Sequence, residues 1–357
     1  MRLLKKIPVI LLIAVNLVVI AAMNFCAYTS CIPPQEHPHL SYFGLMFPIF
    51  LAGNALFLLF WLIIKWRLAP IPIAGMLLCA GSVRAYIPFN LPSAHPEGSI
   101  KVLSYNVMGF GDDRKKPWRE NDILHYLLES KADIICLQEG KKKFIDDAID
   151  SISRIYPYHH HELENDNYIA CFSKFPIVSA QKVDYPAKTN CTYAYEMLVG
   201  TDTLLVINNH LESYKLSKAD KADYKSIIKH YKDPENNDSE TKYHSLTGKI
   251  SQHDSVRGLQ ADSVAAYIAR APHRYIIACG DFNSTPVSYT HHRLTERLDD
   301  AYTRSGNGPG TSYNRSGMYF RIDHILVSPD IEAFEATVDK SISKSDHYPI
   351  HCYVKLK

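Results

Sequence analysis

The sequence lacks the features that mark several common classes of protein. Its 39 Lys and Arg against 37 Asp and Glu leave a net charge of only +2, so no overall charge directs the chain to nucleic acid. Eight cysteines are present without a C-x-x-C pair, which argues against a zinc knuckle. Internal repeats and long low-complexity tracts are also missing. What is left is a chain of 357 residues, long enough for a domain of about 250 residues and a further segment.

Long apolar runs fill the first 90 residues. Three of them, at 7–23, 43–64 and 68–86, approach the about 20 residues that a transmembrane helix needs. The third begins with prolines, which the first turn of a helix tolerates. We therefore predict that residues 1–89 form a membrane anchor of about three helices in the lipid bilayer. A cleaved signal peptide is the alternative for the first run, because its basic start and apolar middle have that form.

Basic residues set the expected orientation of this anchor. One group precedes the first run and another separates the second from the third: Arg2, Lys5, Lys6, Lys65 and Arg67. The loop at 26–40 has no Lys or Arg, so the positive-inside rule assigns both basic groups to the cytoplasm. Three crossings would then leave the residues after 85 periplasmic or extracellular, whereas two would keep them cytoplasmic. Cys26 and Cys31 in this loop are close enough in sequence for a disulfide, with free thiols the equal alternative.

A short linker at 90–98, with Pro92, Pro96 and Gly98, separates the anchor from a domain at 99–357. Strand-like and helix-like runs alternate in that domain, which indicates α/β layers. The expected strands are 100–107, 134–137, 168–172, 196–199, 203–208, 275–278, 324–327 and 350–354. The expected helices are 119–130, 144–155, 224–230 and 256–271. The polar stretch from 214 to 254 is expected to be an unusually long connection. Four cysteines within the apolar runs are predicted to be small buried side chains: Cys136, Cys171, Cys279 and Cys352.

Short polar clusters stand at the ends of the strand-like runs. Asn106 and Glu139 each end such a run, and an amide with a carboxylate suits Mg²⁺. Asp281 and Asn283 follow another, and residues two apart on an extended chain point the same way. An Asp there can orient or deprotonate water and an Asn can hold a phosphate oxygen, although both are also ordinary turn residues. Their repetition at strand ends favours a ligand site.

Histidines complete the pattern. His210 ends a strand-like run, and Asp346-His347 precedes the last one, where a turn would let the carboxylate reach a metal and the imidazole a phosphate. The run at 159–161 is also rich in histidine, but its Tyr and Pro neighbours favour an exposed loop over a metal site.

In this order, the clusters resemble those of the endonuclease/exonuclease/phosphatase superfamily, over residues 100–352. The resemblance implies a four-layer α/β sandwich, two mixed sheets between helices, with the site at the ends of the strands. It also implies a hydrolase of phosphoric esters that uses Mg²⁺, with Mn²⁺ as an alternative.

The resemblance further implies a role for each residue. Glu139, Asn106 and Asp346 correspond to the groups near the metal. Asp281 corresponds to the group that orients or deprotonates the attacking water, and Asn283 to the amide that holds the phosphate. His347 corresponds to the histidine that stabilises the phosphorane, with Asp323 behind it, and His210 to the one that contacts the phosphate. Asp166 and Asn167 lie near a supporting position of the family.

The substrate is less well defined. Met108 stands two residues after Asn106, where abasic-site endonucleases carry Asp or Asn, so a role in DNA repair is disfavoured. Lys141, Lys142 and Lys143 follow Glu139 and are expected either to grip phosphate or to begin a solvated helix. Extracytoplasmic nucleic acid is the leading expected substrate. A phospholipid head group or small phosphoester is the rival, and an inactive scaffold is the weakest alternative because all eight site positions are kept.

Overall fold

The computed structural model describes residues 7–111, 120–141, 149, 151–164, 167–185, 190–217, 219–220, 222–223, 237–315 and 318–357. Asp166, Lys142, Lys143, the helix expected at 224–230 and half of that expected at 144–155 lie outside the described residues.

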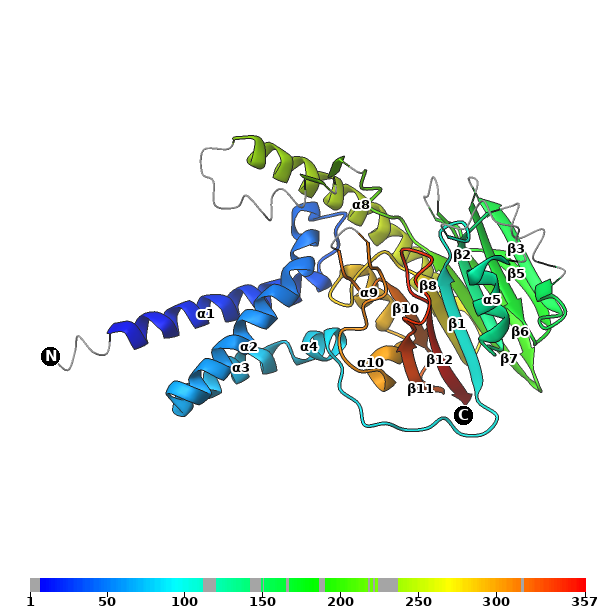
Figure 1. The fold of residues 1–357 in the computed structure, drawn as a ribbon, viewed down its shortest axis with the longest axis horizontal. Coiled ribbons are helices and arrows are strands. Elements are labelled where there is room, and N and C mark those ends of the chain that lie inside the picture. Colours follow the sequence, from blue (N-terminus) through cyan, green and yellow to red (C-terminus); the bar gives the residue numbers. More distant parts are fainter. Residues whose placement is uncertain are drawn as a thin grey trace.

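Two six-stranded mixed sheets form the centre of the domain (Figure 1). The first has the strand order β11-β12-β1-β2-β4-β3 and the second has the order β5-β6-β7-β8-β10-β9. The strands of the first sheet are β1 (Ile100–Asn106), β2 (Ile134–Gly140), β3 (Tyr158–Glu164), β4 (Asn167–Ser173), β11 (Ile331–Val338) and β12 (Ile350–Leu356). Those of the second are β5 (Ile177–Lys182), β6 (Thr192–Val199), β7 (Asp202–His210), β8 (Tyr275–Asp281), β9 (Asp299–Asp300) and β10 (Asp323–Val327).

Alternation of side chains along the strands divides the apolar residues between two faces of each sheet. One core lies between the sheets, where Val102, Ile134, Val206 and Ile277 are buried together. The four cysteines of the strand-like runs are all buried, as predicted. The opposite faces carry separate cores, one of which includes α5 (Asp122–Glu129) and the other the carboxyl-terminal half of α8 (Asn237–Arg270). The predicted four-layer α/β sandwich is confirmed.

Further short helices follow the second sheet's central strand. They are α9 (Tyr289–Thr295) and α10 (Ala301–Ser305). Both begin with a capping side chain: Ser288 accepts from the His291 backbone N–H and Asp300 accepts from that of Tyr302.

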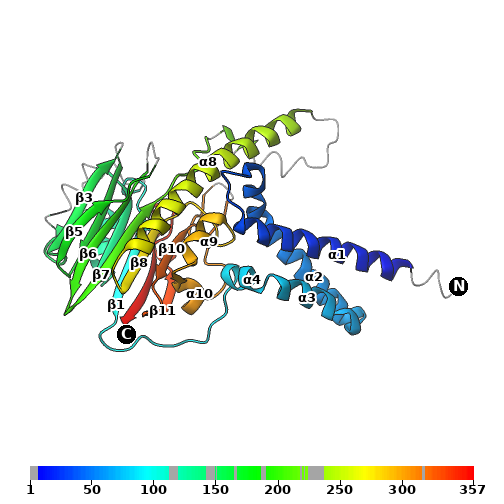
Figure 2. The ribbon, with the colours of Figure 1, turned by 180° about the vertical axis from the view of Figure 1, so that it is seen from behind.

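The amino-terminal helices within residues 7–86, here called the anchor, project from one side of the sandwich (Figures 1 and 2). Helices α1 (Ile7–Tyr28) and α2 (Phe47–Ile64) lie in two helical stretches, Pro8–Cys31 and Pro38–Ile64, that are long and apolar enough to cross a membrane. The third predicted helix is instead a pair, α3 (Pro70–Leu78) and α4 (Ala80–Tyr86), with a bend of 79° between them. Residues 29–46, here called the anchor segment, join α1 to α2 and contain the 3₁₀ helices η1 (Thr29–Cys31) and η2 (Pro38–Met46). A third 3₁₀ helix, η3 (Trp66–Leu68), precedes α3.

Hydrogen bonds between polar side chains join these apolar helices. Asn16 on α1 donates to the Asn54 side chain on α2 at 3.1 Å and accepts from Trp61 Nε1 at 3.2 Å. Asn54 in turn donates to the backbone oxygen of Pro72 on α3 at 2.9 Å. Such hydrogen bonds hold helices in register where lipid offers no competing partner.

Two expectations about elements are wrong. Residues 159–161 are in strand β3, paired with β4, and not in a loop: an edge strand tolerates polar side chains that the sequence pattern assigns to loops. Residues 237–254 of the expected long connection are helical, because α8 extends well beyond its buried half. The bend at Cys79 was not expected either. Cys26 and Cys31, for which a disulfide was one alternative, are both free thiols.

Candidate active site

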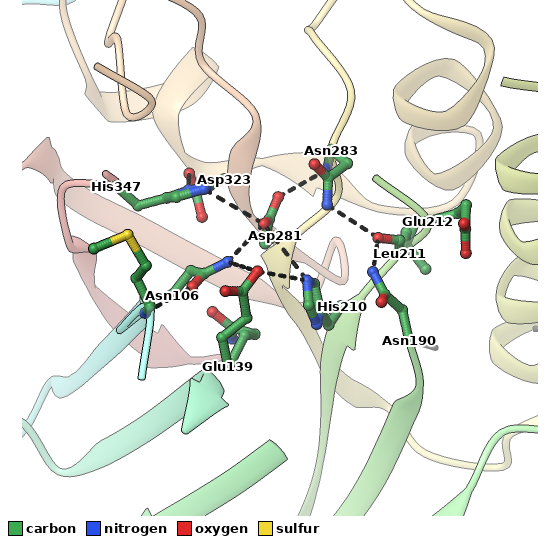
Figure 3. A network of polar contacts seen from close by, with 12 residues as sticks. Asn106, Glu139, Asn190, His210, Leu211, Glu212, Asp281, Asn283, Asp323 and His347 are labelled. Atoms are coloured by element: carbon green, nitrogen blue, oxygen red, sulfur yellow. Dashed lines mark hydrogen bonds and ion pairs between the residues drawn. The ribbon is translucent and has the colours of Figure 1, made fainter. Parts of the chain in front are cut away.

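The site lies where strands of both sheets end at one edge. Strand β1 is parallel to β2, and β7 is parallel to β8, so Asn106 is level with Gln138 and His210 with Asp281. Antiparallel β10 begins at the same level, with Asp323 opposite Asp281. This register gathers predicted site residues that are far apart in the sequence (Figure 3).

Local backbone irregularities turn the side chains into the site. Glu139 and Asn283 have φ angles of 54° and 50°, a conformation that costs free energy for residues other than glycine. The β2–β4 register shifts between Leu137 and Gly140, which places Glu139 in a bulge. Gly280 has φ 132°, and a Cβ there would lie 2.0 Å from the Asn209 backbone oxygen, so only glycine fits before Asp281.

Asn106 bridges two carboxylates. Its Nδ2 donates to Glu139 Oε1 at 3.1 Å and to Asp281 Oδ2 at 2.9 Å. Its Oδ1 accepts from the Met108 backbone N–H at 3.1 Å. On the other side of Glu139 lies His210, with Nε2 at 3.4 Å from Glu139 Oε1 and 3.9 Å from Asp281 Oδ2. Asn106 therefore orients the two carboxylates through its amide nitrogen, and the expectation that it also binds a metal stays a prediction.

A second histidine flanks Asp281. His347 Nδ1 is 2.8 Å from Asp323 Oδ2, and its Nε2 is 3.7 Å from Asp281 Oδ2. Ser345 holds this turn, because its hydroxyl donates to the Asn106 backbone oxygen at 2.7 Å and accepts from the His347 N–H at 3.2 Å. The pairing of His347 with Asp323 matches the expected relation between these residues.

Burial and neighbouring charges separate the proton affinities of these groups. Burial raises the pKa of Asp281 to about 6, with the nearby histidines opposing the rise. Burial would raise the pKa of Glu139 too, but His210 and the Asn106 amide lower it to about 2. Burial would lower the pKa of His347, yet Asp323 and Asp281 raise it well above its usual value. The pKa of His210 is likewise raised, by Glu139 and Asp281 against burial. The site therefore combines two imidazoles whose pKa is raised with one carboxyl group whose pKa is raised to about 6.

The other predicted residues are less central. Asn283 donates from its backbone N–H to Asp281 Oδ1 at 2.9 Å and from Nδ2 to the Leu211 backbone oxygen at 3.0 Å. The Asp346 carboxylate lies 3.5 Å from the Ser345 hydroxyl and belongs to none of the three groups of described side chains that could share a metal ion. Its metal role stays a prediction. Lys141 packs its side chain over Gly109, close to the loop after Asn106.

Several contributors were not expected from the sequence. Asn190 Nδ2 donates to the Leu211 backbone oxygen at 2.6 Å, the same atom that holds Asn283. Arg257 and Gln260 on α8 bind the backbone of Glu212. Residues three apart on a helix lie on one face, so the sequence could have shown that Arg257 and Gln260 act together. Their partner, the backbone after His210, is evident only from the fold.

The donor set fits a hard divalent cation. Glu139, His210 and Asp281 place their ligand atoms within 4.8 Å of one another, and so do Asp281, Asp323 and His347. Carboxylate oxygens are preferred by Mg²⁺ and Mn²⁺. The Glu139 side chain is 32% exposed, so it can be reached from solvent. His210 Nε2 is buried and faces both carboxylates, at 3.4 Å from Glu139 Oε1 and 3.9 Å from Asp281 Oδ2.

A third group of similar composition lies behind the site. His291, Asp300 and His324 also bring ligand atoms within 4.8 Å, and all three are buried. Here Asp300 is already engaged: it accepts from Thr303 at 3.0 Å and lies 4.0 Å from the Arg321 guanidinium. That buried positive charge opposes a cation, so the group is a structural charge cluster.

Comparisons with known proteins agree with this geometry. The sequence model of the Endonuclease/Exonuclease/phosphatase family matches residues 103–347. A family described only as a domain of unknown function matches residues 9–86. The search of curated proteins finds no match.

Solved structures share the fold at low identity. D. rerio TDP2 complexed with single strand DNA product has a TM-score of 0.54 at 14% identity, covering 72% of this chain and 100% of that one. The human Nocturnin catalytic domain with bound sulfate anion has a TM-score of 0.52 at 17% identity, with 75% and 96% covered. An endonuclease/exonuclease/phosphatase from Beutenbergia cavernae has a TM-score of 0.51 at 15% identity, with 72% of each chain covered. Because the family model spans most of the chain and the strand-end residues meet in one site, the chain belongs to the Endonuclease/Exonuclease/phosphatase family and is a hydrolase of phosphoric esters.

Proposed function

We propose that this chain is a membrane-anchored, divalent-metal-dependent phosphodiesterase that cleaves nucleic acid outside the cytoplasm. The observation that carries the proposal is the placement of the Asp281 carboxylate between two imidazoles, 3.7 Å from His347 Nε2 and 3.9 Å from His210 Nε2. A phosphodiester in this space would meet a proton acceptor and two proton donors at once.

The charges support hydrolysis by an attacking water. Asp281, with its pKa raised to about 6 by burial, can orient water and accept its proton near neutral pH. His347, held protonated by Asp323 and Asp281, would stabilise negative charge on the phosphorane. His210 would donate to a phosphate oxygen or to the leaving group, and Asn283 would hold the phosphate.

A Mg²⁺ or Mn²⁺ ion would be held by Glu139, with Asn106 beside it and Asp346 within the neighbouring turn. When bound, such an ion neutralises charge on the phosphate, a contribution of several kcal/mol. Glu139 suits this role because its low pKa keeps it ionised throughout the physiological range.

The test uses the full chain in detergent with bis-nitrophenyl phosphate, plasmid DNA, RNA and sphingomyelin. We expect turnover with Mg²⁺ or Mn²⁺ and loss of turnover with EDTA. Hydrolysis of lipid without hydrolysis of nucleic acid would reverse the substrate ranking. Turnover of no substrate with any divalent metal would support a scaffold instead. Nucleic acid is ranked first because TDP2, which shares the fold, was solved with a single-stranded DNA product.

Contacts between the catalytic domain and the anchor segment support our proposal for the side of the membrane on which the domain lies. Gln35 Nε2 donates to Asp262 Oδ2 on α8 at 2.9 Å, and the Ser255 hydroxyl donates to the Pro34 backbone oxygen at 2.9 Å. These contacts support a topology in which the catalytic domain is on the same side of the bilayer as the loop between α1 and α2.

Lys65 and Arg67, which follow α2, lie on the opposite side if α1 and α2 both span. The chain must then cross once more before it enters the domain, and α3 with α4 is the segment available, in spite of its bend. We infer three crossings, with both basic groups in the cytoplasm and the domain outside it.

Thiol labelling on intact cells can test this topology. The native Cys31 is exposed, and we expect a membrane-impermeant maleimide to modify it. A Lys65→Cys variant that also carries Cys31→Ser should be labelled only after the cells are opened. Labelling of Lys65→Cys from outside would contradict the proposed orientation.

A further inference from the structure

Two side chains on α8 hold the loop that follows His210. Gln260 Oε1 accepts from the Glu212 backbone N–H at 2.8 Å, and Arg257 Nε donates to the Glu212 backbone oxygen at 2.7 Å. Arg257 Nη1 also donates to the Ser284 hydroxyl at 3.1 Å. Because Ser284 follows Asn283, one guanidinium links the loop of His210 to the loop of Asn283.

This guanidinium is fully buried, so its charge must be compensated. Asp254 provides the compensation, with Oδ1 at 2.7 Å from Arg257 Nη1, and Tyr214 stacks 4.4 Å from the guanidinium carbon. Tyr214 also donates its hydroxyl to Asp254 Oδ1 at 3.0 Å. Water entering this cluster would compete for every one of these contacts.

The anchor segment covers the same turn of α8. A Cβ on Gly258 would lie 2.6 Å from Gln35 Oε1 and 2.7 Å from Pro34 Cγ, so the segment approaches the helix as closely as a glycine allows. Burial raises the pKa of Asp254, and the charge of Arg257 and the hydroxyl of Ser41 oppose that rise. The space between anchor segment and cluster is a cavity of about 20 Å³, room for about one water molecule.

The anchor also contacts the loop after Asn283. Val287 is buried in a cluster with Met23 of α1 and Phe47 of α2. A Cβ on Gly44 would lie 2.3 Å from the Val287 backbone oxygen, so this contact too has no spare room. The loop that carries Asn283 is thus fixed at one end by Asp281 and at the other by the anchor.

From these contacts we propose that the anchor segment is a structural part of the active site, and that Arg257 is a positioning residue for the reaction. By covering α8 between Asp254 and Gly258, the anchor segment limits the access of bulk water to the Arg257 cluster. It thereby fixes the two loops that carry His210 and Asn283. The inference rests on the proposed function for its catalytic consequence, whereas the docking itself can be tested without turnover.

The decisive variant is Gly258→Leu in the full chain. Leucine favours helix more than glycine does, so α8 itself should not suffer, but its side chain must push away Pro34 and Gln35. Gly248→Leu is the matched control, because Gly248 is on the same helix and a Cβ there meets nothing within 4 Å.

We expect Gly258→Leu to lower kcat for bis-nitrophenyl phosphate about tenfold or more, with KM and Mn²⁺ affinity nearly unchanged, and Gly248→Leu to behave as wild type. Amide hydrogen exchange should speed up in both loops, at 210–214 and 282–287, in Gly258→Leu alone. If Gly258→Leu does not fold, Gly258→Ala is the milder displacement, and Pro34→Gly should partly restore it by removing the ring that the new methyl group meets.

The exchange measurement separates this inference from the proposed function. A wild-type protein without phosphodiesterase activity would refute the proposed function, while exchange would still report whether the anchor fixes the loops. Unchanged kcat together with unchanged exchange in Gly258→Leu would overturn the inference. Faster exchange with unchanged kcat would confine the anchor to a structural role and refute the catalytic part.

As a second line of evidence, Arg257→Lys should retain part of the activity that Arg257→Ala loses, because an ammonium can still pair with Asp254 but cannot span both loops. Equal loss of kcat in two variants of equal stability would contradict this expected partial rescue. Wild-type kcat in both would remove Arg257 from the proposal.

Discussion

Two clusters of histidine and carboxylate lie within one domain and behave in opposite ways. In the first, Asp281 and Asp323 surround His347 and raise its pKa well above the usual value. In the second, burial and the charge of His291 lower the pKa of His324 to about 3, so this imidazole stays neutral. The residue types are the same, and the balance of charge around them differs.

The difference comes from what each carboxylate already holds. Asp300 accepts from His291, Thr303 and the Tyr302 N–H and neutralises the buried Arg321. Asp281 accepts only from Asn106 and the Asn283 N–H among the described residues, and both histidines stand back from it. A cluster with spare hydrogen-bonding capacity and access can bind and react, whereas a saturated one stabilises the fold.

The sharpest test of the contrast removes one carboxylate charge from each cluster. Asp281→Asn should lower kcat by about 10³-fold with little loss of stability, because it removes the proton acceptor. Asp300→Asn should leave kcat nearly normal below its melting temperature and cost about 3 kcal/mol of unfolding free energy, because it strands the Arg321 charge. Turnover assays and thermal melts on both variants check this, and a large kcat loss in Asp300→Asn alone would reverse the assignment.

A second change addresses the support of His347. Asp323→Asn keeps the shape of the side chain but removes the charge that holds the imidazole protonated, so we expect kcat to fall by roughly 10²-fold. The fall should shrink as the pH is lowered and His347 regains its proton. A pH profile identical in shape to the wild-type profile would exclude this role.

The metal preference can be tested at Glu139. Glu139→Gln should weaken Mn²⁺ binding by roughly tenfold, because one negative charge is lost from the donor set. Isothermal titration measures this directly, with Glu332→Gln, far from the site on β11, as the control. Equal affinity in Glu139→Gln and wild type would assign the ion to other ligands.

The last prediction concerns the protonation of His324 in the second cluster. Its folded-state pKa of about 3 is below the usual 6.5, so between these values the unfolded chain binds more protons than the folded chain. Stability from this group is complete above pH 6.5 and falls by about 3 kcal/mol on acidification to pH 4. His324→Gln, which keeps a donor for the Ser284 backbone oxygen, should flatten that part of the curve of unfolding free energy against pH. A variant curve parallel to the wild-type curve would contradict this.

Much of the site could be predicted from the sequence because its residues stand at the ends of recognisable strands. Asp281, Asn106 and Glu139 follow apolar runs whose burial in a sheet is clear from the sequence, and parallel pairing of β1 with β2 and β7 with β8 brings those ends together. The second cluster contains equally suitable residues, yet its saturation by Arg321 depends on contacts that no local pattern encodes.

Other elements could not be predicted from the sequence, for physical reasons. Strand β3 lies at a sheet edge, where histidines and glutamates are tolerated, so its sequence does not alternate clearly. Among the described residues, the α8 side chains that join the core on the second sheet all come from its carboxyl-terminal half, so the other half has no apolar stripe that the sequence could reveal. Asn190 acts through a backbone oxygen, a partner that any residue at 211 would supply.

The Asn16–Asn54 pair has a consequence beyond helix packing. A single pairing of two amides prevents α1 and α2 from sliding past each other, and the close fit at Gly258 prevents the domain from rocking on the loop between them. In the membrane topology proposed above, the active site would then be held at one fixed height above the lipid. The enzyme would then select phosphoesters by their distance from the bilayer as well as by their chemistry.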